Sequence, residues 1–216
     1  MKLYSNNTSP FTARARLAVY AKNLPVEVII QRDTRSAEYL AINPMGRVPA
    51  LMLDDGTVIP ESDTIVEYLA DAFPEAGLRP ERAADIARGR LLARIAELYV
   101  MASGRALFGQ MDSRTRDDLV VANAFQRMAD GLAHLDAFMT GDKYAAGDVI
   151  TTADCALVPM LTYVSLFGRV LGRADVLAGR RRVDAYWARV QQEPSAAKVM
   201  AEMHAALSGR GVGAPQ

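Results

Sequence analysis

The sequence predicts an α/β domain followed by an all-helical domain. Strand and helix signals alternate over the first part of the chain, whereas only helical periodicity follows it. Between the two parts, residues 73–80 (FPEAGLRP) are rich in proline and glycine, which is typical of a linker. The expected division is an α/β domain at 1–75, a linker at 76–82, a helical domain at 83–208 and a flexible tail at 209–216.

The α/β domain begins with a strand–helix–strand pattern. Residues 2–5 and 26–30 have the composition of buried strands, and residues 10–22 between them carry helical spacing. This pattern predicts a right-handed βαβ unit with parallel strands. A further helix, a hairpin with an Asp-Asp-Gly turn and a last helix complete the order βαβ-α-ββα. The segments that predict the hairpin and the last helix are 50–53, 57–59 and 62–73.

The second domain shows helical periodicity throughout. Apolar residues recur at spacings of three and four, as at Leu91, Ile95 and Leu98. The segments with this pattern are 81–110, 113–139, 151–167, 175–193 and 195–207.

The composition limits the kinds of partner. Twenty-five basic residues balance twenty-five acidic ones, so we expect neither nucleic acid nor an anionic membrane as a partner. The basic run at 180–182 is interpreted as a solvated helix face. No apolar stretch approaches the roughly 20 residues needed to span a bilayer, and the N-terminus lacks a signal-peptide pattern. With Cys155 as the single cysteine, a reducing, cytoplasmic setting is expected.

The sequence lacks the residue patterns that several common catalytic mechanisms require. One cysteine and two distant histidines, His134 and His204, give no zinc-ligand spacing, so no metal is expected. There is also no phosphate-binding glycine loop and no nucleophile elbow.

Ser9-Pro10-Phe11 stands where the first strand meets the first helix. A serine before a proline is a common helix start, with the serine as N-cap, and this role alone accounts for Ser9. A hydroxyl at a helix N-terminus can also stabilise a thiolate, because the free amides and the helix dipole favour negative charge there.

Two further segments are candidates for ligand binding. Residues 43–51 place Pro49 directly before a strand; in a tight turn the backbone of Val48 could pair with an extended peptide, although a polar loop explains the segment equally well. Glu61-Ser62 precedes a helix, where Ser62 is an N-cap candidate and Thr64 with Glu67 fits a capping box. The same residues could hold an anion and an ammonium group.

In this order, the three segments resemble the soluble glutathione transferases, and the resemblance covers nearly the whole chain. Ser9-Pro10-Phe11 resembles the active-site loop of the serine-type classes (theta, zeta, phi, tau and related bacterial forms), 43–51 the cis-proline loop, and Glu61-Ser62 the γ-glutamyl-binding pair. The resemblance implies a thioredoxin-like first domain, a helical second domain, a homodimer and a role in detoxification.

The resemblance also implies a site. Ser9 would stabilise the thiolate of the co-substrate glutathione, which would then attack an electrophilic small molecule. The residues expected to bind glutathione are Phe11, Arg35, Arg47, Val48, Pro49, Glu61 and Ser62. The topology places the electrophile near Tyr99, Ser103, Arg105 and Phe108.

In the helical domain, Ile150-Thr151-Thr152-Ala153-Asp154 resembles the family's capping box and hydrophobic staple. Thr151 would cap the helix, Asp154 would reach back from the third helical position and Ile150 would supply the apolar contact. Cys155 would then be buried and structural.

Two departures from related proteins narrow the chemistry. Thiol–disulfide and dehydroascorbate reductases of the family carry cysteine at the position of Ser9, so redox chemistry of that kind is disfavoured. Zeta-type isomerases carry Ser-Ser-Cys where this chain has Ser9-Pro10-Phe11. A glutathione-dependent isomerase of the maleylacetoacetate type stays as an alternative, as does a non-catalytic regulator resembling the stringent starvation protein.

Overall fold

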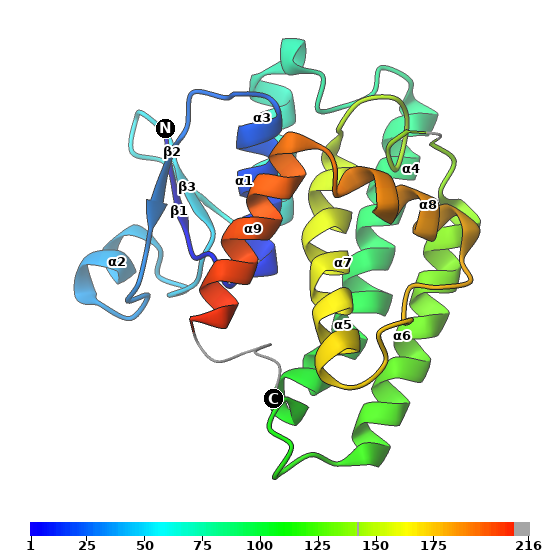
Figure 1. The fold of residues 1–216 in the computed structure, drawn as a ribbon. Coiled ribbons are helices and arrows are strands. Elements are labelled where there is room, and N and C mark those ends of the chain that lie inside the picture. The colour runs from blue at the N-terminus through cyan, green and yellow to red at the C-terminus, as the bar shows by residue number, and fades with distance from the viewer. Residues whose placement is uncertain (142, 210–216) are drawn as a thin grey trace.

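The computed structural model describes residues 1–141 and 143–209. Its first part is a four-stranded mixed sheet with three helices (Figure 1). The strand order is β2-β1-β3-β4, in which β1 pairs parallel with β2 and antiparallel with β3, and β3 pairs antiparallel with β4. The strands are β1 Lys2–Ser5, β2 Glu27–Ile30, β3 Ala50–Met52 and β4 Val58–Pro60, and the helices are α1 Pro10–Ala21, α2 Ala37–Ile42 and α3 Ser62–Ala72.

The predicted order βαβ-α-ββα is therefore confirmed. In Figure 1, α1 and α3 lie between the sheet and the helical part, while α2 lies on the other side of the sheet. Leu3 of β1 and Leu17 of α1 are fully buried between these layers, which is why this strand and this helix carry apolar residues on their facing sides.

The second part is entirely helical within the described residues. It is built around α7, which packs against α1 and α4, while α9 also packs against α1 (Figure 1). The elements are η1 Pro74–Ala76, α4 Ala83–Ile95, η2 Ala96–Met101, α5 Ala102–Gly104, η3 Arg105–Gln110, α6 Asp118–Phe138, α7 Thr152–Val170, α8 Arg181–Val190 and α9 Pro194–Ser208.

Two sequence predictions need correction, and a third falls almost wholly outside the described residues. The single helix predicted at 81–110 is divided: η2 is a π-helix and η3 a 3₁₀-helix, so the period of 3.6 is not kept. The helix predicted at 175–193 begins only at Arg181, after the turn at Gly179 with its φ of 83°. The tail predicted at 209–216 lies, apart from Gly209, outside the described residues.

By length and composition, α7 could cross a membrane, contrary to the expectation that no stretch comes close. However, 83% of this stretch is buried inside the fold, as in the core helix of a globular protein. The predicted capping box is confirmed at its start: the main-chain N–H and hydroxyl of Thr151 both donate to Asp154 Oδ2, at 2.9 and 3.1 Å. Cys155 is fully buried, and burial raises the pKa of its thiol well above the usual range, so this thiol is inert.

Candidate active site

A hollow of about 240 Å³ lies where residues from the end of the sheet face residues from the helical part. Two of the lining residues come from the helical part, Glu97 of η2 and Arg105 of η3. The others are Phe11, Asn43, Met45, Arg47, Val48, Pro49, Pro60, Glu61 and Ser62. Six of the seven residues predicted to bind glutathione thus line one cavity, although they are spread along the chain from Phe11 to Ser62.

The loop at 43–49 is shaped by Asn43. The buried Asn43 side chain donates to the carbonyl of Arg47 at 2.8 Å and accepts from the main-chain N–H of Met45 at 3.2 Å. The hydroxyl of Tyr39 donates to the same carbonyl at 2.7 Å. The peptide bond between Val48 and Pro49 is cis, and the main-chain N–H and C=O of Val48 have no hydrogen-bond partner among the described residues. These two groups are available to an extended peptide.

Glu61 has an unusual backbone conformation, with φ 69° and ψ 122°. A non-glycine residue in such a sparsely populated conformation costs on the order of 1–3 kcal/mol, and residues of this kind cluster at active and ligand-binding sites. Here it turns the chain from β4 into α3, so that Glu61 and the buried Ser62 both border the cavity. The amide groups of the first turn of α3 point towards the same end of the helix.

The helix start itself differs from the prediction. Ser62 is the first helical residue and not the N-cap, which is Glu61, and no side chain caps α3. The capping box expected from Thr64 and Glu67 is therefore absent, because the helix begins three residues earlier than such a box requires. Glu67 instead pairs with Arg79 and Arg90.

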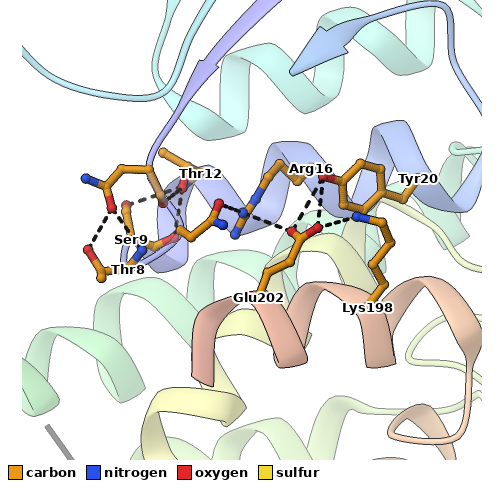
Figure 2. Close-up of polar contacts among 9 residues, drawn as sticks. Thr8, Ser9, Thr12, Arg16, Tyr20, Lys198 and Glu202 are labelled. Carbon is orange, nitrogen blue, oxygen red and sulfur yellow. Dashed lines mark hydrogen bonds and ion pairs between the residues drawn. The ribbon is translucent and has the colours of Figure 1, made fainter. Parts of the chain in front are cut away.

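Ser9 is the N-cap of α1, and its Oγ accepts from the main-chain N–H of Thr12 at 3.4 Å (Figure 2). The hydroxyl accepts this long bond, and its own hydrogen has no acceptor within the part of the chain that the structure describes. Ser9 is half-buried and does not line the 240 Å³ cavity, but Phe11, two residues along, does. The N-cap interpretation is confirmed, and the geometry leaves room for a second role.

Arg14 links the site to the helical part. Its buried guanidinium pairs with Asp63 of α3, at 3.1 Å between Nη1 and Oδ1, and with Glu97, at 3.5 Å between Nη2 and Oε2. Because the charge of Arg14 is buried, both carboxylates are held towards it. Glu97 lines the same cavity as Glu61.

Of the four residues expected near the electrophile, Arg105 and Phe108 lie close to the cavity or to the Ser9 loop. Arg105 lines the cavity. The ring of Phe108 contacts that of Tyr163 at 5.3 Å between centroids, and the Tyr163 hydroxyl donates to the carbonyl of Thr8, next to Ser9. Phe108 is therefore close to the Ser9 loop.

Tyr99 and Ser103 are not brought to the cavity. The ring of Tyr99 packs edge-on against His134 of α6, and Ser103 donates to the carbonyl of Tyr99 at 2.8 Å. The π-helix shifts the register, so that Glu97 and Arg105 face the cavity while Tyr99 and Ser103 face elsewhere. Neither residue lines the 240 Å³ cavity, and their expected place beside the electrophile stays a prediction.

Arg35 is exposed and does not line the cavity. A Cβ on Gly46, which has φ 58°, would stand 2.8 Å from its Nη1, so the guanidinium lies against the 43–49 loop. The side chain would have to swing away from Gly46 to reach a ligand in the cavity.

Sequence reasoning missed Asn43, Met45, Pro60 and Glu97 as lining residues, and Arg14 behind them. Asn43 belongs to the 43–51 motif, and an Asx turn before Gly46 is a recognisable signal. Glu97 carries no comparable signal, because the π-helix at Ala96–Met101 breaks the α-helical spacing around it.

Comparisons with known proteins agree with this geometry. Models of "Glutathione S-transferase, N-terminal domain" and "Glutathione S-transferase, C-terminal domain" match residues 3–77 and 94–194. A maleylacetoacetate isomerase of Pseudomonas aeruginosa is 30% identical over 79% of this chain and 84% of its own length. Glutathione transferase F7 of Populus trichocarpa superimposes with a TM-score of 0.79 at 25% identity, over 94% and 98% of the two chains. A sphingomonad glutathione S-transferase in complex with glutathione gives 0.72 at 26% identity, over 98% and 100%.

A mixed four-stranded sheet domain of thioredoxin-like order, followed by a helical domain, defines the class of soluble glutathione transferases. The chain belongs to the glutathione S-transferase family, since the two models together match well over half of it. Its activity is that of the family: the thiol of glutathione is activated as a thiolate and added to an electrophilic small molecule. The family, the fold and the enzyme class expected from the sequence are confirmed.

Proposed function

We propose that glutathione binds in the 240 Å³ cavity with its thiol beside Ser9. The observation that carries this proposal is the convergence of Val48, Glu61 and Ser62 on one cavity at the end of the sheet. The free main-chain groups of Val48 would pair with the cysteinyl residue of glutathione. Ser62 and the amides at the start of α3 would bind the α-carboxylate of the γ-glutamyl end.

The two carboxylates of the cavity suit the ammonium group at the same end of glutathione. Glu61 comes from the turn before α3, and Glu97 is held in place by Arg14. Arg47, which also lines the cavity, is suited to the glycyl carboxylate. The electrophile would lie near Arg105 and Phe108, above the Ser9 loop. Ser9 would donate a hydrogen bond from its hydroxyl to the sulfur, and the proton of the thiol would be released to solvent as the thiolate forms.

Binding of glutathione tests the site. Glu61→Gln is expected to raise the dissociation constant for glutathione about 10-fold or more, because a charge-assisted hydrogen bond contributes about 1.5–3 kcal/mol. Titration calorimetry measures this constant, with Glu75→Gln as the control: Glu75 is also exposed but does not line the cavity. Unchanged affinity in Glu61→Gln would exclude the proposed orientation. Failure of the wild-type protein to bind glutathione at millimolar concentration would exclude the site.

A glutathione-dependent isomerisation is the second candidate, favoured by the 30% identity to a maleylacetoacetate isomerase. Ser9-Pro10-Phe11 argues for conjugation instead, because it lacks the cysteine of the isomerase motif. Turnover of a chloronitrobenzene and of maleylacetoacetate, measured side by side, decides between them.

We further propose that the protein is a cytoplasmic homodimer, in keeping with the family. A sedimentation measurement of its mass in solution checks the dimer. The third alternative is a non-catalytic regulator resembling the stringent starvation protein. Such a regulator would not need a cavity lined by residues suited to glutathione, so the cavity argues against it.

A further inference from the structure

A cluster of charged and polar residues connects the C-terminal helix α9 to the loop that carries Ser9 (Figure 2). Its centre is Arg16 of α1, which has no exposed surface. Nη1 of Arg16 donates to Oε2 of Glu202 at 3.0 Å and also to Oδ1 of Asn7. One guanidinium nitrogen thus joins a carboxylate of α9 to a side chain two residues before Ser9.

On the side of α9, Glu202 is held by two further residues. The hydroxyl of Tyr20 donates to its Oε1 at 3.3 Å, and the ammonium of Lys198 contacts the same oxygen. The Lys198 ammonium also lies 3.8 Å from the centre of the Tyr20 ring. The Glu202 carboxylate therefore has a defined position although 24% of its side chain is exposed.

On the side of the loop, residues 6–9 form one hydrogen-bonded unit (Figure 2). Oδ1 of Asn6 accepts from the main-chain N–H and the hydroxyl of Thr8, at 2.9 and 2.8 Å. The N–H of Ser9 donates to the carbonyl of Asn6 at 3.1 Å, and the Thr12 hydroxyl donates to the carbonyl of Ser9 at 3.0 Å. Asn7 lies inside this bonded segment, between Asn6 and Thr8, so its displacement would be passed on to Ser9 through the main chain.

The buried charge of Arg16 strengthens the connection that this residue makes between Glu202 and Asn7. Nε and Nη2 of Arg16 have no hydrogen-bond partner among the described residues. Burial lowers the pKa of Arg16, and the charge of Glu202 opposes this effect. Removing the partner of a buried charge is strongly destabilising to the local arrangement, because the charge must then move towards water. For Arg16, such a movement would take its donor away from Asn7.

We propose that Glu202 is a positioning residue for Ser9, acting through Arg16 and Asn7. The C-terminal helix thereby sets where the Ser9 hydroxyl lies and how well it stabilises the thiolate. This inference rests on the proposed role of Ser9 in the transfer reaction. It assigns to α9 a part in catalysis in addition to packing against α1.

The pKa of the glutathione thiol in the complex measures this role, and it follows from the ultraviolet absorbance of the thiolate as a function of pH. Glu202→Gln keeps the shape of the side chain and removes its charge. It is expected to raise the pKa so that about three- to tenfold less thiolate is present at neutral pH. Asn7→Ala breaks the same connection at the other end and is expected to act in the same direction. Glu67→Gln is the matched control: its carboxylate is also 24% exposed and paired with arginines, but it has no contact with the Ser9 loop.

A double-mutant cycle separates positioning from general loosening of the fold. If Glu202 acts through the Ser9 hydroxyl, Glu202→Gln will change the thiol pKa in the wild type and leave it unchanged in Ser9→Ala. An equal change in both backgrounds would overturn the inference. An unchanged thiol pKa in Glu202→Gln would also overturn the inference. In that case a raised thiol pKa in Ser9→Ala would still support the proposed function. If Ser9→Ala itself leaves the pKa unchanged, the proposed role of Ser9 fails and this inference fails with it.

Discussion

Ser9→Ala is expected to raise the pKa of the bound glutathione thiol by about one to two units, because a hydrogen bond from a neutral donor to a charged sulfur contributes about 1.5–3 kcal/mol. A free thiol has a pKa of about 8.5, so the variant would hold mostly thiol at neutral pH. Turnover with a chloronitrobenzene at neutral pH is expected to fall about 10- to 100-fold, in proportion to the thiolate. The loss is expected to shrink as the pH is raised towards the new pKa.

The control for Ser9→Ala is Ser36→Ala. Ser36 is the N-cap of α2, where its side chain accepts from the N–H of Tyr39 at 3.2 Å. Loss of either cap costs about 1 kcal/mol of stability, so the two variants match in their effect on the fold. Only Ser9→Ala is expected to change the thiol pKa. An unchanged pKa would mean that Ser9 is a helix cap and nothing more.

Asp154→Ala is expected to have the largest effect on stability. Asp154 is fully buried and accepts from three donors: the main-chain N–H of Thr151, the hydroxyl of Thr151 and the main-chain N–H of Ala145, the last at 2.9 Å. Alanine would leave these buried donors without a partner, which lowers the free energy of unfolding by about 3–5 kcal/mol. Urea denaturation measures the loss, and Asp148→Ala, at an exposed position of the same loop, is the control.

The pH dependence of this stability follows from the burial of Asp154. Burial raises the pKa of its carboxyl, and the hydrogen bonds from Ala145 and Thr151 only partly oppose the change. The folded state therefore binds the proton more tightly than the unfolded state, so the contribution of Asp154 is greatest at low pH and declines as the pH rises from about 4 through the folded-state pKa. Asparagine does not titrate. The stability advantage of the wild type over Asp154→Asn is thus expected to narrow as the pH rises, and a constant difference would contradict the raised pKa.

Much of the fold could be predicted because its signals are local. The Ser9 cap before Pro10 and the capping box at Thr151 each involve residues within three positions of one another. The order of strands and helices likewise follows from apolar spacing over about ten residues. The site could be predicted only in part: Val48, Glu61 and Ser62 belong to local motifs, and a comparison with a known family brought them together.

The residues that could not be predicted depend on distant contacts. Glu97 borders the cavity because Arg14 pairs with it, and because a π-helix turns Tyr99 towards His134. The helical pattern around Glu97 is compatible with either register, since a π-turn has no clear sequence signal.

The sequence by itself determined the elements, their order and the serine at the start of α1, because backbone geometry and side-chain periodicity act over a few residues. The tertiary structure decided which charges are buried and what faces them. Arg14 meets Asp63 across 49 positions and Arg16 meets Glu202 across 186. Such pairs form only when the whole chain is packed, since a charge leaves water only where folding supplies its partner. Arg16 in turn donates to Asn7, two residues before Ser9, so the surroundings of the Ser9 loop also depend on this packing.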